Sequence, residues 1–207
     1  MIAAALAAAS RFITGATVHW RCDPRATHPR IYFGNHTSHL DFIVIWSALP
    51  ADIRQRVRPV AGEDYWESSP IRRYLARQVF RAVLIERAHA DARHAIERAR
   101  ASTRRMANAL GDRNSLIVFP EGTRGTKGEV GVFKSGLYHL SQSRPDAELI
   151  PVYLENLNRI LPKGEVLPVP MLSRVVFGPP LATIAGERKH DFLARARDAL
   201  IQVGAMR

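Results

Sequence analysis

Short runs of apolar residues, rich in β-branched and aromatic side chains, alternate along this chain with longer segments in which apolar residues recur every three or four positions. The first pattern is typical of strands, and the second of helices with one buried face. The short runs predict strands at residues 30–33, 59–61, 83–85, 115–119, 148–154 and 174–177. The longer segments predict helices at residues 40–49, 65–80, 92–110, 132–142 and 187–203.

The order of these elements predicts the fold class. The strand at 83–85, the helix at 92–110 and the strand at 115–119 form a βαβ unit, which implies parallel pairing. Prolines mark residues 22–29 and 161–170 as loops, the second being a loop or an edge segment. Because no repeat, linker or low-complexity tract divides the chain, we expect one α/β domain.

The N-terminus has a pattern of its own. Residues 2–9 are apolar, but Ser10 and Arg11 follow, and a spanning helix needs about 20 apolar residues. The basic residues that should precede a secretory core are also missing. We expect residues 1–21 to form a helix that either lies in a membrane interface or caps the domain core, and residues 22–207 to form the main domain.

The charge and the cysteine content of the chain limit the classes of partner and the cellular compartments to consider. The 207 residues include 30 basic and 19 acidic ones, for a net charge of +11. Such a chain attracts nucleic acid, an acidic membrane leaflet or phosphorylated substrates, and charge alone does not choose among them. The lone Cys22 cannot form an internal disulfide, which fits a reducing, cytosol-facing location.

A polar cluster between two apolar runs carries the candidate chemistry. Residues 34–41 read Gly-Asn-His-Thr-Ser-His-Leu-Asp and lie where the strand at 30–33 turns into the helix at 40–49. An imidazole can take and return a proton near neutral pH, and a nearby carboxylate can orient the ring and stabilise the imidazolium. We therefore identify His36 as the candidate base and Asp41 as its orienter.

A second polar stretch follows a different strand. Residues 119–124 read Phe-Pro-Glu-Gly-Thr-Arg. Together with the Asn-His-x-Ser-x-x-Asp pattern at 35–41, this stretch resembles the glycerolipid acyltransferases, specifically the 1-acylglycerol-3-phosphate acyltransferase family. Two weaker blocks of that family, at 83–87 and 149–153, occur in the same order. The resemblance covers residues from about 30 to about 155.

The resemblance implies a single α/β domain with a mixed, mostly parallel sheet flanked by helices. It implies transfer of a fatty acyl group from acyl-CoA or acyl carrier protein to the free hydroxyl of lysophosphatidate or a related lysophospholipid. His36 would act as general base, and the hydroxyl would attack directly, without an acyl-enzyme. No cofactor or metal is implied. The expected partners are these substrates and an anionic membrane surface, without nucleic acid, for a peripheral or monotopic protein at the cytoplasmic face of the membrane.

The same resemblance also implies which residues bind the glycerol phosphate. It places this role on Glu121, Gly122, Thr123 and Arg124, and more loosely on Arg87. A glycine, a hydroxyl and a forked cation at a strand end suit a phosphate. A carboxylate beside a phosphate repels it, so Glu121 either hydrogen-bonds a substrate hydroxyl or holds an arginine or the loop. Lys134 is a candidate surface contact for an anionic acyl carrier.

Two other functions stay open on the residues alone. His36, His39 and Asp41 could ligate a metal in a hydrolase, although none of the other histidines lies in a similar cluster. The net charge also fits a basic module that binds nucleic acid or anionic lipid, although the common RNA-binding and zinc-finger signatures are missing. Metal analysis tests the first alternative, and salt-dependent RNA binding without acyl transfer tests the second.

Overall fold

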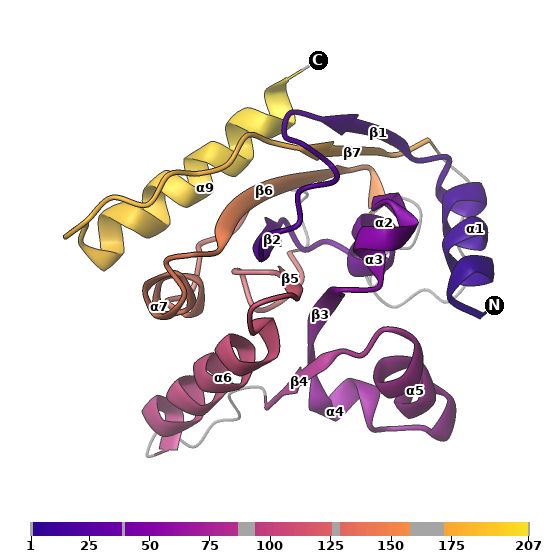
Figure 1. Cartoon of the computed structure of the whole chain (residues 1–207), viewed down its shortest axis with the longest axis horizontal. Helices are drawn as coiled ribbons and strands as arrows, with labels where there is room; N and C mark the ends of the chain where they lie inside the picture. Colours follow the sequence, from indigo (N-terminus) through magenta and orange to yellow (C-terminus); the bar gives the residue numbers. More distant parts are fainter. Residues whose placement is uncertain (1, 39, 87–93, 126–128, 158–171, 207) are drawn as a thin grey trace.

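The computed structural model describes residues 2–38, 40–86, 94–125, 129–157 and 172–206. Its centre is a seven-stranded sheet in the order β1-β7-β6-β2-β5-β3-β4 (Figure 1). The strands are β1 (Thr17–Trp20), β2 (Arg30–Gly34), β3 (Val57–Gly62), β4 (Val83–Ile85), β5 (Ser115–Val118), β6 (Glu148–Glu155) and β7 (Arg174–Phe177). All neighbours pair in parallel except β6 and β7. The expectation of a mixed, mostly parallel sheet is confirmed.

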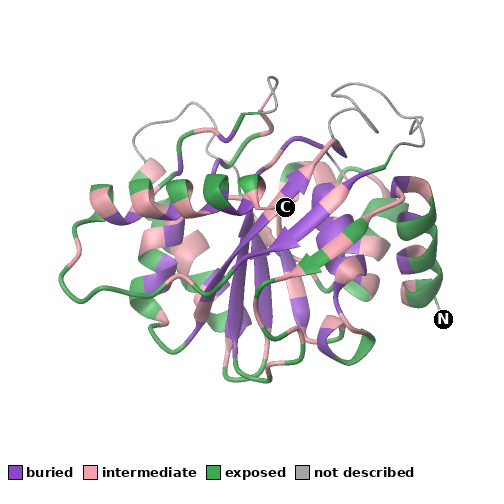
Figure 2. Ribbon diagram, turned by 90° about the horizontal axis from the view of Figure 1, so that it is seen from above, coloured by how far each residue is buried: buried purple, intermediate pink, exposed green. Residues whose placement is uncertain are grey.

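The helices of the described residues cover both faces of this sheet (Figure 2). They are α1 (Ile2–Thr14), α2 (Asp41–Ala48), α3 (Ala51–Arg54), α4 (Glu63–Trp66), α5 (Pro70–Tyr74), the π-helix η1 (Leu75–Val79), α6 (Ala95–Leu110), α7 (Gly136–Ser143) and α9 (Lys189–Ala205). Successive side chains of β2 point to opposite faces of the sheet, so the core has two parts. Tyr32 packs with α1, α2 and α3, whereas Ile31 and Phe33 pack with α6, α7 and α9. The result is a three-layer α/β/α domain.

The βαβ unit is present, with one difference from the simplest expectation. β4, α6 and β5 follow one another in sequence, and β4 and β5 run in the same direction, but β3 lies between them and pairs with both. The chain therefore crosses over one strand instead of placing β4 beside β5. The sequence predicts parallel direction from the helical crossover, whereas strand order depends on contacts between distant segments.

Two predicted helices differ from the structure at their boundaries. Residues 65–80 are not one helix, because α4 ends at Trp66 and α5 begins again at Pro70. Ser69 has extended backbone and its side chain accepts a hydrogen bond from the Arg72 amide, as a helix N-cap does, and proline favours the first helical position. The helix expected from residue 132 begins only at Gly136.

The N-terminal 21 residues are helical only in part. α1 ends at Thr14, and β1 then pairs in parallel with β7 at the sheet edge. The expectation of one helix over residues 1–21 is therefore wrong at 17–20, where β-branched and aromatic side chains complete the sheet instead. In the described part of the chain, no helix is both long and apolar enough to cross a bilayer. Residues 161–170, expected to be a loop or edge segment, lie outside the described residues.

Candidate active site

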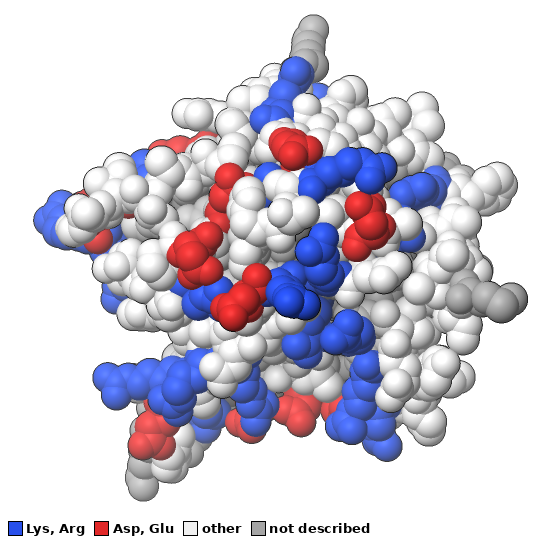
Figure 3. All heavy atoms as spheres, in the orientation of Figure 1, with Lys and Arg blue, Asp and Glu red and all other residues white. Residues whose placement is uncertain are grey.

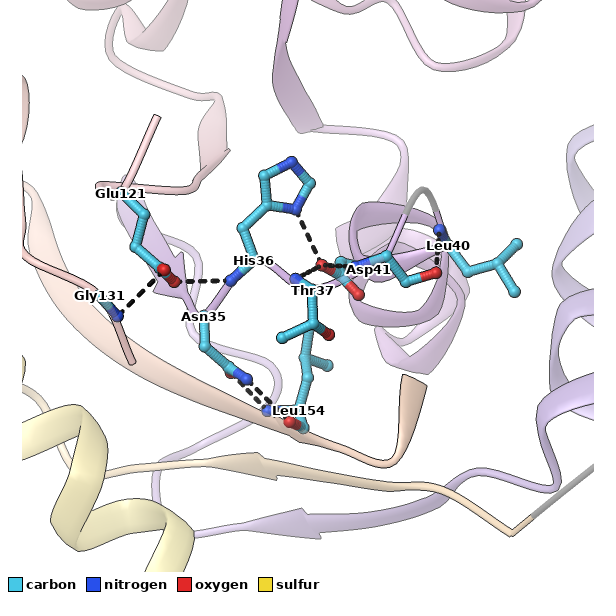
Figure 4. Close-up of polar contacts among 9 residues, drawn as sticks. Asn35, His36, Thr37, Leu40, Asp41, Glu121, Gly131 and Leu154 are labelled. Atoms are coloured by element: carbon cyan, nitrogen blue, oxygen red, sulfur yellow. Dashed lines mark hydrogen bonds and ion pairs between the residues drawn. The ribbon is translucent and has the colours of Figure 1, made fainter. Parts of the chain in front are cut away.

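The turn between β2 and α2 brings the two candidate catalytic side chains together (Figure 4). His36 Nδ1 lies 2.8 Å from Asp41 Oδ2. The same carboxylate oxygen accepts hydrogen bonds from the backbone amides of Thr37 at 2.6 Å and Ser38 at 2.8 Å. Because Asp41 has an exposed fraction of 0% and His36 is only part-buried, the buried carboxylate is fixed and the imidazole is the member that substrate can reach.

The Asp41 contact determines which ring nitrogen is available. A carboxylate accepts hydrogen bonds, so Nδ1 carries the proton that points to Asp41 and Nε2 keeps its lone pair. Figure 4 shows the second ring nitrogen directed away from Asp41. The His36 ring also stacks on Phe119, with centroids 4.4 Å apart and planes 18° apart. The hydrogen bond and the stacking together hold the ring in one orientation suited to a general base.

Asn35 fixes the start of the turn. Its side-chain amide donates to Leu154 O at 2.9 Å, and its side-chain oxygen accepts from Leu154 N at 2.8 Å. These two bonds extend the β2–β6 pairing one residue beyond Gly34, because the Asn35 side chain forms the hydrogen bonds that a strand backbone would otherwise form. A Cβ at Gly34 would lie 3.0 Å from Val152 O, so the close approach of these strands favours glycine there.

Glu121 connects the loop after β5 to this turn. Its Oε1 accepts from the His36 amide at 2.8 Å, and its Oε2 accepts from the Gly131 amide at 3.0 Å (Figure 4). Gly125 N donates in return to His36 O at 2.8 Å. Glu121 is buried, and a Cβ at Gly131 would lie 2.7 Å from Oε2. The carboxylate thus holds both loops, which is one of the two roles expected for it.

Two cationic side chains, Arg124 and Lys134, lie near the same loop. Gly122 has a φ of +69°, and a Cβ there would lie 2.8 Å from Lys134 Nζ. Its amide donates to Phe119 O at 3.0 Å, so this amide is already occupied within the turn. Arg124 and Lys134 both line the cavity at His36. Within the described residues, neither side chain has a hydrogen-bond or ion-pair partner.

The cavity at His36 is mainly apolar. It has a volume of about 330 Å³, within the roughly 300–1,000 Å³ typical of small-molecule sites. One wall comes from α4 and the other from α6 and α7, under the ends of β3, β4 and β5. The apolar side chains that line it include Phe42, Tyr65, Trp66, Ile85, Met106, Phe119, Leu137 and Leu140. His36, Arg124 and Lys134 therefore line a cavity that is otherwise mainly apolar.

The structure places most of the predicted site residues, but not all of them. His36, Asp41, Glu121, Gly122 and Arg124 meet at the carboxyl ends of β2 and β5, and Thr123 is exposed on the same loop. Arg87 and His39 lie outside the described residues. Among the residues that are described, no group of three or more His, Cys, Asp or Glu side chains is arranged to hold a metal.

Two residues join the site through contacts between distant segments. Lys134 enters the site because its amide donates to Pro120 O at 2.8 Å, which lays residue 134 against the loop after β5. Arg197 of α9 donates from Nη2 to Val130 O at 2.7 Å and from Nε to Gly131 O at 3.0 Å. Arg197 therefore supports the segment that holds Glu121. From the sequence, Lys134 is expected only as a surface contact for an acyl carrier, and Arg197 belongs to no recognisable motif.

Comparisons with known proteins identify a family and a similar fold. A family model described as acyltransferase matches residues 16–155. The fold is similar to the crystal structure of the 1-acyl-sn-glycerophosphate (LPA) acyltransferase PlsC from Thermotoga maritima, with a TM-score of 0.70 and 18% sequence identity, over 97% of this chain and 78% of that chain. No curated protein matches the chain by sequence.

Proposed function

This chain belongs to the acyltransferase family, and we propose that it moves a fatty acyl group from an acyl thioester to the free hydroxyl of lysophosphatidate or a related lysophospholipid. The observation that carries the proposal is the His36–Asp41 pair at the end of an apolar cavity beside two cations without ion-pair partners among the described residues. A solved protein with a similar fold is an LPA acyltransferase, which supports this acceptor.

The first step is removal of a proton from the acceptor hydroxyl. His36 Nε2 accepts this proton while the hydroxyl oxygen attacks the thioester carbonyl. The carbon–sulfur bond then breaks, and the imidazolium returns the proton to the departing thiolate, which leaves as a thiol. Asp41, fully buried 2.8 Å from Nδ1, stabilises the imidazolium between these two transfers.

The apolar cavity and the two cations suit different parts of the substrates. The apolar walls that include Trp66, Met106 and Leu140 suit an acyl chain, because burial of methylene groups is favourable. Arg124 and Lys134 suit the acceptor phosphate, which a guanidinium can bind through two parallel hydrogen bonds. Glu121 then acts as a positioning residue, since each of its oxygens accepts from a backbone amide.

Direct attack without an acyl-enzyme is part of the proposal. Burial raises the pKa of the Cys22 thiol, although the Arg30 charge opposes this, and the thiol is not part of the cavity lining. A raised pKa leaves less of the thiolate that a nucleophile needs. Ser38 is buried, and its hydroxyl accepts from the Leu40 amide. Both residues therefore fit structural roles better than nucleophilic ones.

The experiment that tests the function measures thiol release from palmitoyl-CoA by the purified protein. Release is compared with lysophosphatidate, with a monoacylglycerol that has the same hydroxyls but no phosphate, and without acceptor. We expect release that depends on lysophosphatidate, together with formation of phosphatidate. If palmitoyl-CoA fails as donor, the same three reactions are run with acyl carrier protein loaded with palmitate.

Each other outcome points to a different function. Release that is independent of any acceptor would indicate a thioesterase. Equal rates of thiol release with lysophosphatidate and with the monoacylglycerol would show that the protein does not recognise the acceptor phosphate. Stoichiometric zinc in the purified protein, required for activity, would favour the metal-dependent hydrolase instead.

A further inference from the structure

A second hollow in the described part of the molecule lies at the other end of β3 from the catalytic cavity. Val57, the first residue of β3, lines the hollow, whereas Val60, Ala61 and Gly62, the last three, line the catalytic cavity. The two share no lining residue. We call the second one the arginine hollow, and its walls include Trp46, Arg54, Gln55, Val79, Phe80 and Arg81.

Two hydrogen-bond donors on residues of the arginine hollow are buried without a partner among the described residues. One is the indole Nε1 of Trp46, a residue with an exposed fraction of 2%, and the other is Arg54 Nε. A buried donor without an acceptor is destabilising, and each such group in a native protein needs an explanation, such as a bound ion. An indole and a guanidinium can only donate. Both groups would therefore be satisfied by a ligand that accepts hydrogen bonds.

The charge of Arg54 also lacks compensation. Its Nη2 donates to Ser47 O at 3.3 Å and to Leu49 O at 2.9 Å, and its Cζ lies 5.1 Å from the centroid of the Trp46 ring. All three partners are neutral. Burial, and then the nearby charge of Arg11, lower the pKa of Arg54. A nearby anion would stabilise the charged guanidinium more than a neutral acceptor does.

Arg81 brings a second guanidinium to the hollow from a strained backbone. Its φ is +50°, a conformation that costs energy in residues other than glycine and that is concentrated at functional sites. The Arg81 side chain is exposed and donates to Gln55 O at 3.5 Å. Burial, and then the Arg81 charge, lower the pKa of Arg58. An arginine is therefore held here despite strain and despite a like charge beside it.

Acidic residues do not neutralise these arginines. Within the part of the chain that the structure describes, neither Arg54 nor Arg81 forms an ion pair, and no Asp or Glu lines the hollow. Asp52, on the adjacent α3, pairs with Arg25 instead. Figure 3 shows further basic side chains gathered at the edge of the molecule beside α4 and α5, which η1 continues. An anionic ligand would be attracted to this side.

The rest of the hollow is largely apolar. Val57, Val79 and Phe80 line it, and the Phe80 ring packs edge to face on Trp46, with centroids 5.2 Å apart. The volume is about 410 Å³, within the roughly 300–1,000 Å³ typical of small-molecule sites. An anion that carries an apolar group would bury that group against these side chains, which is favourable.

We propose that the arginine hollow binds a small, soluble organic phosphate. Its phosphate would accept from Arg54, Arg81 and Trp46 Nε1, and its apolar part would lie against Val79 and Phe80. A guanidinium can bind a phosphate through two parallel hydrogen bonds, and such charge-assisted bonds are stronger than neutral ones. Water would satisfy the two donors but would leave the arginine charges unbalanced. Because the hollow is separate from the catalytic cavity, this proposal does not rest on the proposed reaction.

The test follows the indole N–H signals in a nitrogen–proton NMR spectrum. The chain has three tryptophans, and the spectrum of Trp46→Phe identifies the signal of Trp46 by its absence. The other two signals report on other places, because Trp66 lines the catalytic cavity and Trp20 stacks on Phe177. Phenyl phosphate is titrated into the protein. Phenol, and sodium chloride at the same ionic strength, are the controls.

We expect phenyl phosphate to shift the Trp46 signal until it saturates, and phenol and sodium chloride to leave it unchanged. Arg81→Gln should raise the dissociation constant roughly tenfold or more, because it removes a charge-assisted bond. Arg113→Gln removes the same charge from an exposed turn and should leave the dissociation constant unchanged. Both positions are exposed, so both variants should keep the unfolding midpoint, which circular dichroism checks.

Four results would overturn the proposal. The first is a Trp46 signal that does not respond to phenyl phosphate, and the second is one that responds equally to phenol. Equal losses of affinity in Arg81→Gln and Arg113→Gln would indicate attraction to the net charge instead of a site. A response to micelles of short-chain phosphatidylglycerol without a response to phenyl phosphate would exclude a soluble ligand. If phenyl phosphate shifts only the Trp66 signal, the phosphate binds in the catalytic cavity, which also contradicts the proposal.

Discussion

The two loops that meet at the candidate active site are held in different ways. In the turn after β2, the catalytic contacts are local, because His36, Thr37, Ser38 and Asp41 bond within six consecutive residues. The loop after β5 depends on distant groups, since Glu121 accepts from His36 and Gly131, and Arg197 of α9 supports Gly131. The geometry of the proposed base thus depends on local contacts, whereas its position relative to the proposed phosphate-binding loop depends on tertiary contacts.

Because the two loops are held differently, substitutions in them should have different effects. Substitutions in the local turn should reduce catalysis and leave the fold intact. Substitutions in the assembled loop should change binding, loop position and stability together. The following variants test this contrast, from the largest expected effect to the smallest.

His36→Ala removes the proposed base and should have the largest effect. A positioned general base contributes about 100- to 10,000-fold to the rate, so kcat should fall by that range while the unfolding midpoint stays unchanged. Acceptor-dependent thiol release measures the rate, and His190→Ala, at an exposed position of α9, is the control. Near-normal turnover by the His36 variant would refute the assignment.

Asp41→Asn should keep the geometry and remove the charge. One carboxylate oxygen, Oδ2, accepts from His36 and from both backbone amides, and an asparagine oxygen at that place could do the same. The hydrogen bond to a charged acceptor, worth about 1.5–3 kcal/mol, then becomes one to a neutral acceptor, worth about 0.5–1.5 kcal/mol, which should lower kcat roughly 10-fold. The pH profile of kcat should also shift. Asp52→Asn, in an exposed ion pair, serves for comparison, and an unchanged profile at position 41 would argue against the imidazolium role.

Arg124→Ala should act on binding rather than on the chemical step. Loss of charge-assisted hydrogen bonds to a phosphate should raise the acceptor KM roughly 10-fold or more, with a much smaller change in kcat. Arg113→Ala removes the same charge from an exposed turn and should leave KM unchanged. If both variants have the same KM as the unchanged protein, the acceptor phosphate is bound elsewhere.

Glu121→Gln distinguishes a positioning role from direct acceptor binding. A glutamine must turn its NH2 group toward either the His36 or the Gly131 amide, which leaves a buried donor without a partner and costs about 1–3 kcal/mol of stability. We therefore expect a lower free energy of unfolding in urea together with a lower kcat. The exposed neighbour Glu129, changed in the same way, should show neither effect. A rise in acceptor KM alone would restore the direct binding role.

Arg197→Gln should have the smallest effect of the series. It removes guanidinium bonds to Val130 and Gly131 carbonyls, which should lower the free energy of unfolding by about 1–2 kcal/mol and kcat only several-fold. Arg188→Gln breaks an exposed ion pair at the N-cap of the same helix, where a loss of about 0–1 kcal/mol is normal. Equal losses in the two variants would show that α9 does not support the Glu121 loop.

The sequence predicted much of this fold because its signals are local. The strands at β2, β4, β5, β6 and β7 follow from apolar runs, and α2, α6 and α9 follow from periodic apolar positions. Errors occurred where a neighbouring residue changed a boundary, as Pro70 did when it began a new helix. β1 was missed because four residues after a helix carry little periodic signal, and its stability comes from pairing with β7, more than 150 positions away.

The candidate site divides in the same way. By itself, the sequence predicted the pairing of His36 with Asp41, because a histidine and an aspartate five positions apart at a strand-to-helix turn can bond without help from the rest of the chain. Only the tertiary structure decided that Glu121 holds the His36 amide, that Lys134 lies against Gly122, and that Arg197 supports the loop. These contacts join segments from different strands and helices, and their energies depend on packing across the whole sheet, which no local pattern of residues records.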